Sequence, residues 1–99
     1  MTERALVTAS IAAENTFSNP LEVFEAYNFA LSGTWTATVH LQHSFDGGTT
    51  WLDDGSTFTA NGVWIGDVVR RGQQVRLGVK TGNYTNGTVV CRLSRGGVE

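Results

Sequence analysis

The chain has 99 residues, 40% of them hydrophobic and 10% aromatic, which is enough for one folded domain with one core. Its formal net charge of -2 gives no basic patch of the kind that binds nucleic acid, so we expect no nucleic-acid partner. The single cysteine, Cys91, excludes an intrachain disulfide, and no apolar run is long enough to span a membrane.

The first third of the chain predicts two strands, because its apolar residues alternate with a period of two. Residues 5–13 place Val7, Ala9 and Ile11 on one face, and we interpret residues 1–13 as an N-terminal strand or arm. Residues 15–20 predict a turn. Residues 21–31 form the second run, in which Glu25 interrupts the apolar face and indicates an edge or a bulge.

The clearest strand spans residues 34–45, where Trp35, Ala37, Val39, Leu41 and Phe45 share one face with His43. A tight hairpin turn follows at residues 46–48, and the return strand, which begins at residue 51, is expected to stop at residues 53–55. Four further short strands are predicted at residues 57–60, 63–69, 74–80 and 88–94, and residues 95–99 are expected to form a frayed tail.

About seven or eight short antiparallel strands with turn signals between them predict an all-β fold. We expect residues 1–99 to form a single small β-sandwich, Ig-like or jelly-roll-like, with a small barrel as the main competing architecture. The expected fold contains no helix of any length.

One local motif is fully specified. Residues 44–51 (SFDGGTTW) match the Asp-box pattern Ser-x-Asp-x-Gly-x-Thr-Trp, whose specified positions are Ser44, Asp46, Gly48, Thr50 and Trp51. The Asp carboxylate can accept backbone N–H bonds within its own loop, and the Trp can pack across the turn. A single copy leaves no room for a propeller, so we interpret the motif as structural.

The sequence contains no clear catalytic or metal-binding motif. His40 and His43 fall on opposite faces of one strand, so they cannot share one metal ion unless the strand contains a bulge. Asp46, Asp53 and Asp54 gather around one hairpin but match no EF-hand spacing. Cys91 lies on an apolar face, where a thiol behaves as a small hydrophobe. We therefore expect no enzyme, no cofactor and no bound metal.

Two segments carry apolar residues on both faces and are candidates for contact with other chains. In residues 63–67 the bulky residue is Trp64, and in residues 5–13 the side chains are small on both sides. The candidate interface residues are Leu6, Val7, Trp64, Arg70 and Arg71, with the two arginines as rim residues facing an acidic partner. Trp35 and Trp51 are expected in the core.

Much of the chain resembles small β-proteins encoded among the structural genes of tailed bacteriophages. The matching segments are residues 31–39 (LSGTWTATV), 41–51 (LQHSFDGGTTW), 75–90 (VRLGVKTGNYTNGTVV) and 92–94 (RLS). The resemblance does not extend to residues 1–28. It implies a virion component made in the host cytoplasm.

From this resemblance we expect a capsid decoration (cement) protein on the outer surface of the head. Such proteins are small, all-β and free of catalytic residues, and they commonly bind as trimers. The expected partners are the major capsid protein and other copies of this chain in a homotrimer, with no membrane. The alternative is a head-fibre, collar or tail-associated module that binds host glycan through an exposed Trp64 or Tyr84.

Overall fold

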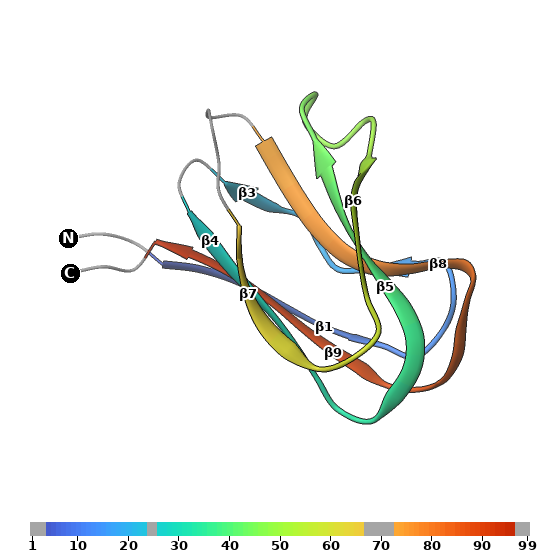
Figure 1. The fold of residues 1–99 in the computed structure, drawn as a ribbon. Helices are drawn as coiled ribbons and strands as arrows, with labels where there is room; N and C mark the ends of the chain where they lie inside the picture. Colours follow the sequence, from blue (N-terminus) through green and yellow to red (C-terminus); the bar gives the residue numbers. More distant parts are fainter. Residues whose placement is uncertain (1–3, 24–25, 67–72, 97–99) are drawn as a thin grey trace.

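The computed structural model describes residues 4–23, 26–66 and 73–96 (Figure 1). These residues form nine strands and no helix. The strands make two antiparallel sheets that pack face to face, so the predicted all-β sandwich is confirmed.

The first sheet, here sheet A, has four strands. Their order across the sheet is β1 (Arg4–Ile11), β9 (Val89–Gly96), β4 (Tyr27–Ser32) and β7 (Gly62–Gly66). Each strand is antiparallel to its neighbour.

The second sheet, here sheet B, has five strands. Two short strands, β2 (Thr16–Phe17) and β3 (Leu21–Val23), both pair with β8 (Gln73–Gly87), which is followed across the sheet by β5 (Trp35–Ser44) and β6 (Leu52–Phe58). All of these pairs are antiparallel as well.

The core lies between the two sheets, and the period-two alternation identified its faces correctly. The fully buried members come from both sheets, whose inner faces together form one core. The largest of them are Ile11, Leu77, Leu93, Val23, Val39, Val75, Val79 and Val89.

The predicted single run at residues 21–31 is divided between the two sheets. β3 belongs to sheet B and β4 to sheet A, so the chain crosses from one layer to the other between them. The predicted faces still hold, since Val23, Tyr27, Phe29 and Leu31 are all buried. Glu25, the residue expected to mark an edge or bulge, lies outside the described residues.

The expected breaks at residues 53–55 and 81–83 were wrong. β6 runs through Gly55 and β8 through Gly82, both with positive φ, 95° and 87°. The pairing register of β5 shifts against β6 and against β8, so the glycines allow irregular ladders in place of chain reversals. Residues 57 and 58 of the strand expected at 57–60 are therefore the end of β6, and residues 59 and 60 lie outside any strand.

Other boundaries also differ from expectation. The turn expected at residues 15–20 contains β2, because the Ser18 N–H donates to Leu77 O and the Leu77 N–H donates to Ser18 Oγ. The tail expected to fray from residue 95 is still strand at Arg95 and Gly96, which pair with β1. β7 ends at Gly66, and residues 67–69 of the expected strand lie outside the described residues.

Three aromatic residues expected in the core are less buried than predicted. Trp35 is partly buried and packs against the core, Trp51 is half-buried, and Phe45 is 60% exposed. Ser44 is fully buried in place of Phe45. The reason is that β5 ends at Ser44, so Phe45 lies beyond the strand, on the hairpin.

Candidate functional site

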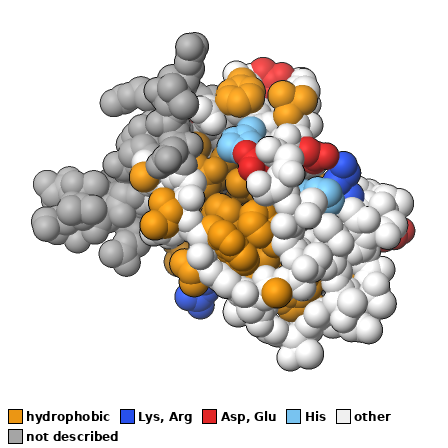
Figure 2. Space-filling model, in the orientation of Figure 1, with side chains coloured by type: hydrophobic (Ala, Val, Ile, Leu, Met, Phe, Trp, Pro, Cys, Tyr) orange, Lys and Arg blue, Asp and Glu red, His pale blue; other side chains and the backbone are white. Residues whose placement is uncertain are grey.

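A groove opens between the edges of the two sheets, where β7 of sheet A and β6 of sheet B diverge from the turn that joins them. It encloses about 290 Å³. Figure 2 shows it as a hollow with hydrophobic side chains at its bottom and a histidine and acidic side chains beside it. Its lining comprises Tyr27, Phe29, Leu41, His43, Asp54, Ser56, Phe58, Trp64, Ile65 and Gly66.

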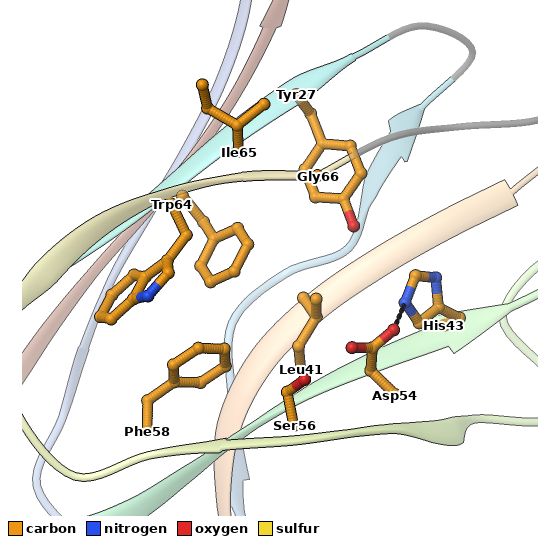
Figure 3. A pocket seen from close by; sticks show the side chains of 10 residues that line it. Tyr27, Leu41, His43, Asp54, Ser56, Phe58, Trp64, Ile65 and Gly66 are labelled. Carbon is orange, nitrogen blue, oxygen red and sulfur yellow. Dashed lines mark hydrogen bonds and ion pairs between the residues drawn. The ribbon is translucent and has the colours of Figure 1, made fainter.

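An aromatic cluster forms one wall of this groove. The Trp64 ring lies 4.6 Å from the Phe58 ring across the gap between the sheets and stacks on Phe29 at 5.5 Å. Phe29 meets Phe58 edge-on at 5.4 Å. In Figure 3, Trp64 and Phe58 point toward one another from opposite strands. These contacts hold the two edges together near the turn, so the groove is open only farther along the strands.

The other end of the groove is polar. His43 Nε2 lies 2.7 Å from Asp54 Oδ1, and the two side chains face the groove from β5 and β6 (Figure 3). The buried Nδ1 of His43 has no hydrogen-bond partner among the described residues. Ser56 lines the same groove, but no hydrogen bond joins it to His43 in the described part of the chain.

The described part of the chain contains no cluster of side chains that could bind a metal ion. No group of three or more His, Cys, Asp or Glu side chains is placed to hold an ion there. His40 and His43 have separate partners, since His40 Nε2 contacts the Asn83 amide. Cys91 is buried in sheet A, and burial raises the pKa of its thiol to about 12.

The Asp-box closes on itself through the hydrogen bonds that its residue types suggested. Ser44 Oγ donates to Asp46 Oδ1 at 2.8 Å and accepts from the Gly48 N–H at 2.8 Å. The Thr49 and Thr50 N–H groups donate to the same Asp46 oxygen. Hydrogen bonds from Thr50, and then from Ser44, lower the pKa of Asp46 to about 2. The motif is a self-contained hairpin, and the side chains of Ser44 and Asp46 are occupied by hydrogen bonds within it.

Among the described residues, the two most exposed large apolar side chains, those of Val63 and Ile65, lie on the outer face of sheet A. Val63 is 76% exposed, Ile65 75% and Leu6 57%. Val63 and Ile65 lie outward on β7 because Trp64 between them points inward. A shallow hollow of about 340 Å³ lies on this face between its two edges, and it is lined by Leu6, Asn28, Phe29, Ala30, Val63, Arg92 and Ser94.

The outer face of sheet B is polar by contrast. Gln42 Nε2 donates to Asp53 Oδ1, and Lys80 Nζ lies 2.7 Å from Asp53 Oδ2. Arg76 donates to Gln42 Oε1, so one network joins three strands. These polar groups satisfy one another, and the exposed apolar side chains of sheet B, Phe45 and Leu52, lie at its hairpin end.

The predicted interface residues do not form one surface. Leu6 is exposed on the outer face of sheet A. Val7 and Trp64 are partly buried and pack against the core, so their contact with another chain stays a prediction. Arg70 and Arg71 lie outside the described residues. Sequence reasoning missed Val63 and Ile65, although the apolar residues on both faces of this segment were the signal.

The exposed aromatic platform expected for glycan binding is not formed by Trp64 or Tyr84. Trp64 is held in the aromatic cluster, and Tyr84 is half-buried with its hydroxyl donating to Gly87 O.

No family model, curated protein or solved structure matches the chain. In the described ranges no helix is long and apolar enough to cross a membrane.

Proposed function

We propose that this chain is a capsid decoration protein of a tailed bacteriophage, bound to the outer surface of the head through the outer face of sheet A. Two things support the proposal: the resemblance of the segments 31–39, 41–51, 75–90 and 92–94 to phage structural proteins, and the exposed apolar side chains on that face. The second carries the argument, because an exposed Val63 and Ile65 on an edge strand are costly unless a partner covers them.

The proposed mechanism is burial of apolar surface without chemistry. Val63, Ile65 and Leu6 would be covered by the major capsid protein, and the exposed Arg92 between them would face an acidic group there. A stable interface of about 800 Å² per partner requires most of this face. Contacts that span neighbouring capsomers would then oppose the outward pressure of packaged DNA.

A reconstitution experiment tests this proposal. Phage particles that lack the protein are mixed with the purified chain, and bound protein is measured after sedimentation of the particles. The unaltered chain is expected to co-sediment in saturable amounts, and the double variant Val63→Lys/Ile65→Lys is expected to lose most of this binding. The matched control is Thr36→Lys, which adds a charge at an exposed site on sheet B. Equal binding by all three chains would exclude sheet A as the contact.

The alternative function, recognition of host glycan, is favoured by one observation. A hollow of about 340 Å³ beside Trp35 is lined by threonines and the Asn83 amide. An indole wall with hydroxyl and amide groups around it suits a sugar ring. Binding on a glycan array that Trp35→Ala abolishes would support this function, and an array without signal would exclude it for the sugars tested.

A further inference from the structure

Three edge strands of sheet B are protected against pairing with another chain. β2 has two residues and β3 has three, which is too short for a stable ladder. β6 carries Asp53 and Asp54 and is irregular at Gly55. Short length, charge and irregularity are the usual means by which proteins block edges.

The two edges of sheet A lack this protection. β7 reads Gly-Val-Trp-Ile-Gly, without a charge or a proline. On β1, residues 6–11 (LVTASI) are likewise uncharged. Neither strand pairs with a second strand among the described residues, since they end the order β1-β9-β4-β7. Among the described residues, sheet A is therefore unpaired at both edges.

The exposed apolar side chains lie at these two open edges, on the same face of the sheet. The pairing registers place Leu6, Ser94, Asn28 and Ile65 in one row across the four strands. Thr8, Arg92, Ala30 and Val63 form the next row. Each row thus begins on β1 and ends on β7 with a side chain that nothing covers from the side.

The directions of the strands fit a contact between the two edges. Each of the four strands is antiparallel to the next, so β1 and β7 run in opposite directions. When two copies face the same way, β7 of one copy therefore meets β1 of the next copy in antiparallel orientation. This is the pairing that continues the ladder already present in sheet A.

We infer that copies of this chain associate head to tail, with β7 of one copy paired to β1 of the next. In the register of these rows the contact places Ile65 beside Leu6 of the neighbour and Val63 beside Thr8, within the short distance of cross-strand pairs. A head-to-tail contact closes into a ring when the rotation between copies allows it. The inference deepens the proposed function and rests on it for the position of the ring on the capsid, but the contact itself forms in solution.

Cysteine cross-linking tests which edges meet. Leu6→Cys and Ile65→Cys are made as separate variants, and Val63→Cys is added to cover a register shift of two residues. Head-to-tail pairing predicts a disulfide-linked dimer when Leu6→Cys is mixed with one of the β7 variants, and none when any variant is oxidised alone. Cys91 is buried and does not compete for these links.

Other results would overturn the inference. A dimer from Ile65→Cys or Val63→Cys alone would mean that β7 pairs with β7, and a dimer from Leu6→Cys alone would mean that β1 pairs with β1. Absence of links from every mixture would mean that the edges do not meet. Phe45→Cys serves as control, because it is 60% exposed but lies on the sheet B hairpin, where no link is expected.

A second readout separates this inference from the proposed function. The mass of the unaltered chain in solution, measured by light scattering without phage particles, should exceed that of a monomer. Val63→Lys/Ile65→Lys should be monomeric. A monomeric native chain that still decorates particles would refute the ring and leave decoration standing. An oligomer that fails to bind particles would refute decoration and leave the ring standing.

Discussion

The guanidinium of Arg76 lies 4.4 Å from the centre of the Trp51 ring, and its other side faces the ring of Phe17 at 4.1 Å. Arg76 Nε also donates to Gln42 Oε1 at 2.9 Å. The stack joins β2, β8 and the end of the Asp-box across the outer face of sheet B. A cation between two aromatic rings fixes three segments that are distant in the sequence.

Replacing Arg76 should therefore destabilise the domain without altering the core. Arg76→Ala is expected to lower the free energy of unfolding by about 1–3 kcal/mol, the sum of two cation–π contacts and one charged hydrogen bond. The urea midpoint of unfolding measures this. Arg92→Ala, at an exposed site on β9, is the control and should change stability by less than about 0.5 kcal/mol. Equal effects of the two variants would contradict the role of the stack.

The lowered pKa of Asp46 makes stability depend on pH in a defined window. Hydrogen bonds to the carboxylate lower its pKa from 3.8 to about 2 in the folded chain, so the unfolded chain binds more protons between these values. The contribution is fully present above about pH 4 and is lost as the pH falls toward 2.

The variant Asp46→Asn isolates this contribution. At neutral pH its urea midpoint should lie below that of the unaltered chain, and the two midpoints should converge as the pH falls through the window. A difference that stays constant from pH 7 to pH 2 would show that the ionised carboxylate is not what stabilises the hairpin.

At Gly78, β8 packs so closely against β2 that there is no space for a side chain. A Cβ built there would lie 2.1 Å from the Phe17 ring and 2.6 Å from Thr16 O, so β2 could not lie where it does. Gly78→Ala is expected to cost about 1–3 kcal/mol of stability. The cost should be smaller in a Phe17→Ala background, and a double-mutant cycle on the urea midpoints gives the coupling. Additive effects would mean that the ring is not the obstacle.

Cys91 should resist modification in the folded chain. It is 1% exposed, and burial raises the pKa of its thiol to about 12, so little thiolate is available at pH 8. A chromogenic disulfide reagent is expected to react slowly under native conditions and completely in urea. Fast native labelling would show that sheet A opens at β9, and it would also complicate the cross-linking experiment.

The alternation of apolar residues was sufficient to predict the fold class and the buried faces. The alternation identified Val39 and Leu41 on β5 as buried, and likewise Val75, Leu77 and Val79 on β8. This works because a half-buried strand alternates apolar and polar residues along the sequence. The Asp-box hairpin could also be predicted from the sequence, because all of its hydrogen bonds lie within residues 44–50.

The groove and the open edges could not be predicted in the same way. Trp64 meets Phe58 only because strands from different sheets converge, and its pairing with Phe29 depends on β4 and β7 being neighbours, so no local pattern specifies either contact. Gly55 and Gly82 were interpreted as chain reversals because a positive φ in a turn and one in a bulge require the same residue. The exposure of Val63 and Ile65 depends on β7 being an edge, which is a property of strand order.

The most direct test of capsid decoration is a cryo-electron microscopy map of the phage particle that contains this protein, with the copies of the chain located and counted. Decoration predicts copies spread over the whole outer shell, with sheet A against the major capsid protein and β7 of each copy beside β1 of the next. A few copies confined to the portal vertex, a fibre or the tail tip would contradict decoration and favour the recognition module.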